Sequence, residues 1–273
     1  MSSSTIDRWN EIAESWHRWI PHMHSWYEPA TELMLDLVSI GSGNRILDIA
    51  AGDGDQSLTV AERVGLNGYV LAIDRAEKLL AIAEKSAQTA RYSNIETHLM
   101  DGENLELPEN SFDAAICRFA LMFFNDPVQG LKGVKRVIKT NGKFSAVVYA
   151  ENGDPEFLTA LTTVQEFLGI ERLAKPAATS LGNLKVLEQT LKEAGFTDVE
   201  VHPLTLEVKM ESTEECVNYL QDTSPTIREL VQPLSPDEQN RVWKAVDEAL
   251  AIYETPSGFE VQHRVLVAVG GKS

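Results

Sequence analysis

Residues 46–55 read ILDIAAGDGD, an apolar run that ends in a glycine-rich turn, and a helical pattern follows from about Gln56. A strand, a glycine turn and a helix in this order are typical of the first unit of a nucleotide-binding α/β sheet. Glycine suits such a turn because it adopts positive φ angles without steric cost. The stretch therefore predicts an α/β fold whose ligand lies at the ends of parallel strands.

Short apolar runs alternate with helical periodicity through residues 45–150, as in a parallel sheet with crossover helices. Because the runs are almost continuously apolar, we expect the strands to be covered on both faces. Asn141 and Gly142 predict a turn before the fifth of these strands. The expected fold is a Rossmann-like, doubly wound, mostly parallel sheet of seven strands. Its strands are predicted at residues 45–51, 69–74, 95–100, 112–119, 142–150, 197–208 and 261–269.

Three segments lie outside this alternation and have helical character: residues 1–40, 151–180 and 209–258. In open α/β sheets, helices added near the carboxyl ends of the strands can cover the ligand. We therefore interpret residues 1–273 as a single domain, with residues 41–150 as the cofactor-binding core and the three segments as caps over one site.

The chain has 24 Lys and Arg residues against 41 Asp and Glu residues, a net charge of −17. This charge repels phosphate backbones and anionic lipids, so nucleic acid and stable membrane association are not expected. The two cysteines, Cys117 and Cys216, form no CxxC motif, which argues against a zinc cluster or a disulfide framework. With no signal peptide or membrane span in the sequence, we expect a cytoplasmic protein that binds a small molecule. The sequence does not indicate an oligomeric state.

The glycine turn is unusually acidic, because it carries Asp48, Asp53 and Asp55. These carboxylates would repel a pyrophosphate, and Ser57 replaces the third glycine of the pattern for nicotinamide cofactors. S-adenosylmethionine has no phosphate and presents a cationic ammonium and a cationic sulfonium, so it suits the turn better. The simpler alternative is that Asp53 and Gly54 form a plain turn and that Asp55 caps the following helix.

Two further carboxylates end the next two strands. Asp74 follows Gly54 by 20 positions, about the spacing at which an acidic side chain reaches ribose hydroxyls. Asp101 can accept a hydrogen bond from an adenine amine, although an Asp-Gly pair alone is most often a turn. Three acidic strand ends in succession indicate a nucleoside ligand.

Four stretches in this order, ILDIAAGDGD, LAIDRA, MDGENLELPENSFDAAICRFALMFF and VKRVIKTNGKF, resemble class I S-adenosylmethionine-dependent methyltransferases. The resemblance is closest to the branch that includes the ubiquinone and menaquinone C-methyltransferases (methyltransferase type 11). It covers residues 43–150 well and the three cap segments hardly at all. Asn141-Gly142 departs from the Gly-Gly turn that is usual in the family.

The resemblance implies S-adenosyl-L-methionine as the cofactor and assigns residues to its parts. Around its methionine part it implies Asp48, Ala50, Gly52 and Gly54, and at the ribose Asp74 and Arg75. At the adenine it implies Asp101 and Gly102. The backbone of Arg118 and Phe119 would lie against the cofactor, and residues 121–124, which include Met122, would form an apolar wall near the methyl group.

Methyl transfer from a sulfonium is an in-line displacement that depends mainly on positioning and exclusion of water. A hydroxyl acceptor would benefit from a general base, and His17, His22 and His24 cluster in the N-terminal segment as candidates. Trp19, Trp26 and Tyr27 lie in the same segment and could, with Met122, enclose a flat apolar substrate. The simpler alternative is that the aromatic residues are core and the histidines partly exposed. No metal is expected, because Arg118 and Phe119 stand where a metal would need oxygen ligands.

The leading hypothesis is methylation of a small apolar or aromatic metabolite, with an oxygen acceptor preferred because of the histidines. C-methylation of a quinone precursor and N-methylation of a small molecule are the alternatives within the same class. A non-catalytic cofactor-binding module and a nicotinamide oxidoreductase are the alternatives from other classes.

Overall fold

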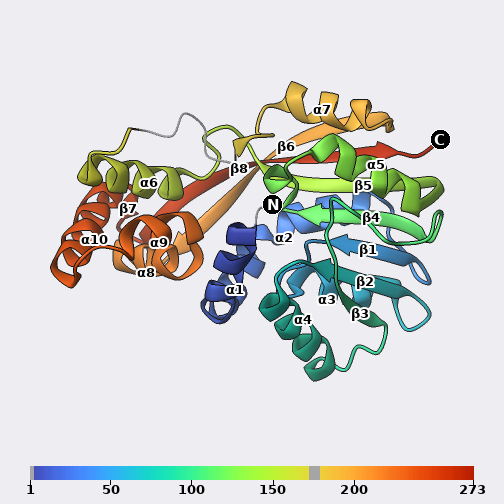
Figure 1. Cartoon of the computed structure of the whole chain (residues 1–273), viewed down its shortest axis with the longest axis horizontal. Coiled ribbons are helices and arrows are strands. Elements are labelled where there is room, and N and C mark those ends of the chain that lie inside the picture. Colours follow the sequence, from blue (N-terminus) through green and yellow to red (C-terminus); the bar gives the residue numbers. More distant parts are fainter. Residues whose placement is uncertain (1–2, 172–178) are drawn as a thin grey trace.

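The computed structural model describes residues 3–171 and 179–273, with side chains from Ile6 onward. Its centre is a sheet with strand order β3-β2-β1-β4-β5-β8-β6 (Figure 1). The first five strands along this order are parallel, and β8 is antiparallel to both of its neighbours. The strands are β1 Arg45–Ile49, β2 Tyr69–Asp74, β3 Ile95–Leu99, β4 Phe112–Arg118, β5 Ile138–Tyr149, β6 Thr197–Met210 and β8 Gly258–Gly271, and the two-residue β7, Glu254–Thr255, pairs with β8.

Helices pack on both faces of the sheet. Alternate residues of β1 enter different cores: Ile46 packs with α2 (Ile20–Leu37) and α3 (Asp55–Val64), and Leu47 packs with α5 (Pro127–Val137) and α7 (Leu184–Glu193). The direction of winding reverses between β1 and β4. Ligands of open α/β sheets bind outside the carboxyl ends of the strands at such a switch point.

Helix α1 and the start of α2 lie beside these carboxyl ends, where His17 and His24 meet Asp53 and Asp55 after β1. Helix α1 (Ser3–Arg18) continues almost directly into α2, and α1 packs against α4 (Glu77–Thr89). A short 3-10 turn, η1 (Leu121–Phe123), follows β4 at the same end. The loops after β1 and β4 therefore face the N-terminal helices.

Strands β6 and β8 extend beyond the rest of the sheet as a two-stranded ribbon. Strand β5 pairs with β8 only over residues 265–271, whereas β6 continues alongside β8 as far as Phe259. The remaining cap helices lie along this ribbon, at the left of Figure 1. They are α6 Pro155–Leu168, α8 Thr213–Thr223, α9 Pro225–Val231 and α10 Pro236–Leu250, followed by the 3-10 turn η3 Ala251–Tyr253.

The expected α/β sheet is confirmed, and all seven predicted strands are present: β2 has the predicted bounds, and the other six have shifted ends. The fifth strand begins at Ile138 rather than at residue 142, because Ile138 already pairs with Phe112 of β4. Asn141, with a left-handed φ of 64°, lies in the bulge before the pairing resumes at Lys143. The expectation that every strand is covered on both faces is wrong for the edge strand β3, in which no residue is buried and Leu99 is exposed. Within the described residues, no helix combines the length and apolar character needed to cross a membrane.

Candidate functional site

A cavity of about 430 Å³ opens at the carboxyl ends of β1, β2, β4 and β5, which is in the usual size range for small-molecule sites. One end is lined by the glycine turn and by the acidic ends of β2 and β3. The other end is lined by aromatic and apolar side chains from α2, η1, α6 and α8. A smaller hollow of about 310 Å³ lies around Lys143 and Asp198, at the opposite end of the strands from this cavity.

The glycine turn after β1 takes the left-handed backbone that its sequence predicts. Ala50, Gly52 and Gly54 have φ values of 56°, 59° and 86°. A Cβ on Gly54 would meet Ala83 of α4 at 2.8 Å, whereas a Cβ on Gly52 would meet no atom within 4 Å. The missing side chain of Gly54 therefore lets the start of α3 pack against α4. Gly52 leaves open space in the cavity for a ligand.

Asp74 ends β2 at the cavity and holds the glycine turn. Its two oxygens accept hydrogen bonds from the N–H groups of Gly52 at 2.9 Å and Ala76 at 2.8 Å. Burial raises the pKa of Asp74, and these backbone donors counteract the rise. Each carboxylate oxygen can accept more than one hydrogen bond, so Asp74 can hold the turn and still meet a ligand.

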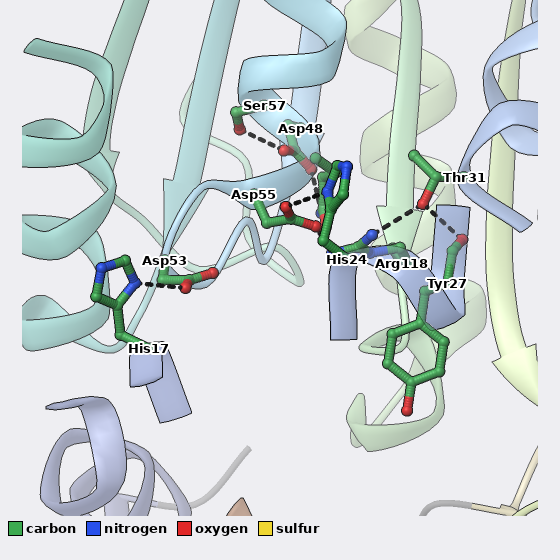
Figure 2. A network of polar contacts seen from close by, with 10 residues as sticks. His17, His24, Tyr27, Thr31, Asp48, Asp53, Asp55, Ser57 and Arg118 are labelled. Atoms are coloured by element: carbon green, nitrogen blue, oxygen red, sulfur yellow. Dashed lines mark hydrogen bonds and ion pairs between the residues drawn. The ribbon is translucent and has the colours of Figure 1, made fainter. Parts of the chain in front are cut away.

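Asp48 supports the turn from behind and is not among the residues that line the cavity. Its oxygens accept hydrogen bonds from Gln56 Nε2 at 2.8 Å and from Ser57 Oγ at 2.5 Å, and Figure 2 shows the bond from Ser57. Burial raises the pKa of Asp48 to about 6, against these two hydrogen bonds. The prediction that its carboxylate lies at the cofactor has no support from this geometry.

The simpler alternative for Asp55, that it caps helix α3, is wrong. Gly54 occupies the capping position, and Asp55 is the first residue of the helix. Its Oδ2 accepts a hydrogen bond from Arg118 at 2.7 Å, and Arg118 also donates to Thr31 Oγ1 of α2 at 2.8 Å. Burial by itself would raise the pKa of Asp55, but Arg118 and His24 hold it below its usual value.

The histidines predicted as bases are absent from the described lining of the cavity. His17 Nδ1 lies 3.0 Å from Asp53 Oδ2, and His24 Nδ1 lies 2.7 Å from Asp55 Oδ1 (Figure 2). His22 lies 3.7 Å from Glu215 of α8. All three rings are about half exposed, and two of them join the N-terminal helices to the acidic turn.

Helical periodicity explains which residues of the N-terminal segment line the cavity. Ile20, Met23 and Tyr27 follow an i, i+3, i+7 spacing and line it. Trp19 and Trp26 lie on another face, where their rings pack on Tyr219 of α8 at 5.3 and 5.4 Å. The prediction that these two tryptophans contact the substrate is therefore wrong, because their rings pack between helices instead. Tyr27 and Met122, predicted for the same role, do line the cavity.

Arg75, predicted at the ribose, and Asp101 and Gly102, predicted at the adenine, come together at the cavity. Arg75 and Asp101 form an ion pair at 3.2 Å, and both line the cavity with Gly102. Asp101 also accepts a hydrogen bond from the Glu103 N–H at 3.0 Å, so the expected turn is present as well. A Cβ on Gly102 would meet a methyl group of Ile49 at 2.7 Å, so a larger residue here would force Ile49 to shift.

The aromatic end of the cavity centres on Phe119, whose φ is 55°. Its ring lies 4.7 Å from that of Tyr27 and 4.6 Å from that of Tyr149, centroid to centroid. The hydroxyls of the two tyrosines are hydrogen-bonded at 2.7 Å. Tyr219 and Phe157 complete this wall.

A buried polar cluster beside this wall was missed from the sequence. His263 Nε2 lies 2.5 Å from Glu156 Oε1 and 3.8 Å from Asp154 Oδ1. Asp154 lines the cavity. The three side chains lie close enough together to hold a metal ion. In the sequence, Asp154 stands directly before Pro155, a pattern that predicts the start of a helix but does not indicate a functional site.

Comparisons with known proteins agree with this geometry. A family model described as a methyltransferase domain matches residues 40–180. The demethylmenaquinone methyltransferase of Bacillus velezensis is 29% identical over 189 residues, which cover 63% of this chain and 78% of that protein. The same enzyme of Listeria welshimeri is 31% identical over 115 residues, 41% of this chain and 48% of that protein.

Solved structures show the same fold. The YcgJ protein of Bacillus subtilis superposes with a TM-score of 0.61 at 18% identity, covering 90% of this chain and 98% of that one. A SAM-dependent methyltransferase of Aquifex aeolicus superposes with a TM-score of 0.53 at 19% identity, covering 70% and 89%. At such identities the likeness concerns the fold alone.

Proposed function

This chain belongs to the methyltransferase domain family, and we propose that it methylates a small, largely apolar or aromatic acceptor at a hydroxyl oxygen. Family membership makes it an S-adenosylmethionine-dependent methyltransferase. The observation that carries the proposal is a cavity that joins the acidic glycine turn to an aromatic wall.

The residues present fit S-adenosylmethionine. Gly52 leaves open space at the cavity, so a ligand can approach the backbone of the turn. Asp53, Asp74 and Asp101 contribute carboxylates to the lining, which suits a ligand that carries ammonium and sulfonium cations. When bound, the cofactor supplies an activated methyl group. Asp74 and Asp101 would meet its hydroxyls and amine.

The acceptor would occupy the aromatic end. Phe119, Tyr149 and Phe157 present apolar surface there, and the hydroxyls of Tyr27 and Tyr149 supply a small number of polar contacts, as is usual for ligand pockets. A closed apolar site also excludes the water that would compete with an acceptor.

We propose that the three helical segments act as one cap over this cavity. Residues of α1, α2, α6, α8 and α9 contribute to its lining; residues 172–178 of the predicted cap lie outside the described residues. The pairs His17–Asp53 and His24–Asp55 would hold the N-terminal part of the cap on the glycine turn, which is a positioning role rather than that of a base.

C-methylation of a quinone precursor is the second candidate. It is favoured by two relatives, both demethylmenaquinone methyltransferases at about 30% identity. A ring hydroxyl is present in the quinol form of such acceptors. The two candidates therefore need the same cavity and differ in which atom faces the methyl group.

The test is transfer from S-adenosylmethionine labelled with ¹³C at the methyl group. A naphthol, a demethylmenaquinol analogue and an aromatic amine are offered separately, and the product is analysed by NMR. A methoxy signal from the naphthol supports the proposal. A methyl group on a ring carbon would support C-methylation instead, and a methyl group on nitrogen would support N-methylation. Omission of the acceptor is the control for spontaneous breakdown of the cofactor.

A further inference from the structure

Asp154 lies where the cap meets the aromatic end of the cavity. It caps helix α6 by accepting a hydrogen bond from the Phe157 N–H at 3.2 Å, and its side chain is 16% exposed. It lines the cavity together with Tyr27, Tyr149 and Tyr219. A carboxylate therefore reaches the region proposed for the acceptor.

Behind Asp154 lie two ionisable groups that solvent does not reach. Glu156 and His263 are each 1% exposed, and they bond to each other at 2.5 Å. Glu156 Oε2 and His263 Nδ1 have no hydrogen-bond partner among the described residues. Burying a carboxylate and an imidazole in this way costs stability compared with an apolar core. Groups kept at such a cost beside a cavity are candidates for a functional role.

The tyrosine hydroxyls link this cluster to the cavity. The ring of Tyr149 lies 5.6 Å from that of His263, and the ring of Tyr27 lies 6.0 Å from it, centroid to centroid. The hydrogen bond between the two hydroxyls leaves one of them able to donate to a ligand oxygen. An acceptor hydroxyl at this wall would face tyrosine hydroxyls and the Asp154 carboxylate together.

We propose that Asp154 is the general base of methyl transfer, with Glu156 and His263 as positioning residues, an inference that rests on the proposed function. The acceptor O–H bond breaks and its proton passes to the Asp154 carboxylate. The electron pair left on the acceptor forms the new bond to the methyl carbon. The bond from that carbon to sulfur breaks with its electrons remaining on sulfur, which becomes a neutral thioether.

The electrostatics of the cluster suit this role. Burial and the neighbouring Glu156 raise the pKa of Asp154 to about 7, while His263 opposes the rise. A general base works best when its pKa lies near the working pH, because a large fraction is then deprotonated while the group still accepts a proton readily. The ionisable groups that face Asp154 come from five elements: Tyr27 on α2, Tyr149 on β5, Glu156 on α6, Cys216 and Tyr219 on α8, and His263 on β8.

This assignment narrows the class of acceptor. A base is useful for an acceptor that must lose a proton to become nucleophilic, such as a phenol or a quinol. A thioether or a tertiary amine already has a free electron pair and needs no base. We therefore infer that the acceptor has an ionisable hydroxyl at its reacting end.

The test compares Asp154→Asn with Asp126→Asn. Asparagine keeps the helix-capping oxygen but removes the base. Asp126 caps α5 by the same type of bond, to the Gln129 N–H at 2.9 Å, and is not among the lining residues. The wild type should show a kcat/KM that rises with pH through about 7. Asp154→Asn should lower kcat/KM by about 10²-fold or more and remove this rise. Asp126→Asn should change neither.

Affinity for S-adenosylhomocysteine, measured by calorimetry, should be the same in both variants and the wild type. Retention of activity and of the pH rise in Asp154→Asn would overturn the assignment of the base and leave the proposed function intact. Loss of wild-type turnover on chelation, restored by Mg²⁺ or Mn²⁺, would make the cluster a metal site instead. Absence of turnover with every hydroxylated acceptor would overturn the proposed function, and this inference with it.

Discussion

Replacement of Arg118 by methionine tests the buried ion pair that joins β4, α3 and α2. Arg118 and Asp55 are 10% and 7% exposed, and the guanidinium also donates to Thr31. Removing one partner of such a pair leaves a buried charge, which costs about 3–5 kcal/mol of unfolding free energy. His24 stays as a partner of Asp55, so we expect about 3 kcal/mol, at the lower end of this range.

The assay is urea denaturation of Arg118→Met, with the free energy of unfolding obtained by linear extrapolation. The matched control is Lys192→Met, which breaks the exposed pair between Lys192 and Glu188 and should cost about 0.5 kcal/mol or less. Adding Asp55→Asn to Arg118→Met should recover part of the loss, because the uncompensated charge is removed. A loss below about 1 kcal/mol for Arg118→Met would refute the reasoning that this pair is desolvated.

Four further predictions follow from the site. Gly52→Ala and Gly43→Ala should lose similar stability, about 1 kcal/mol, because both residues have positive φ and open surroundings. Only Gly52→Ala, at the cavity, should weaken calorimetric binding of S-adenosylhomocysteine, by about tenfold or more; equal binding in both would contradict our position for the ligand. Asp74→Ala should weaken the same binding by about 1–3 kcal/mol, and unchanged affinity in a folded variant would remove Asp74 from the ribose. Asp48 has a folded pKa of about 6 against an ordinary 3.8, so its contribution to stability falls as pH rises between these values. Relative to wild type, Asp48→Asn should gain about 2.5 kcal/mol of unfolding free energy from about pH 4 to about pH 8 in urea denaturation. A pH-independent difference would show that burial does not raise the pKa of Asp48. His22→Ala should leave kcat and cofactor affinity unchanged, because this ring lies outside the cavity lining; a large fall in kcat would return His22 to the list of possible bases.

Much of the fold could be predicted because the decisive signals are local. The apolar runs at β1 and β2 need only their own residues to be recognised, and the turn after β1 needs glycine where φ is positive. Strand ends were less predictable, since pairing decides them. Strand β5 starts at Ile138 because β4 pairs with it there, although Asn141 and Gly142 have the composition of a turn.

The candidate site divides in the same way. The cofactor end follows strand ends that any parallel sheet brings to one edge, so Asp74 and Asp101 could be named in advance. Gly102 was added by the family resemblance. The acceptor end depends on which face of each cap helix turns inward. The composition of residues 16–27 suggested Trp19 and Trp26 as readily as Tyr27, and packing against α8 decided between them.

The sequence by itself determined the sheet, the acidic glycine turn and the class of cofactor, because each depends on neighbours a few positions apart. The tertiary structure alone decided that His17 and His24 pair with Asp53 and Asp55, and that Glu156 meets a histidine 107 positions later in the chain. Strand β8 returns beside the start of α6 through the long ribbon that it forms with β6. No local pattern encodes such a contact, because it arises from long-range packing of strands and helices.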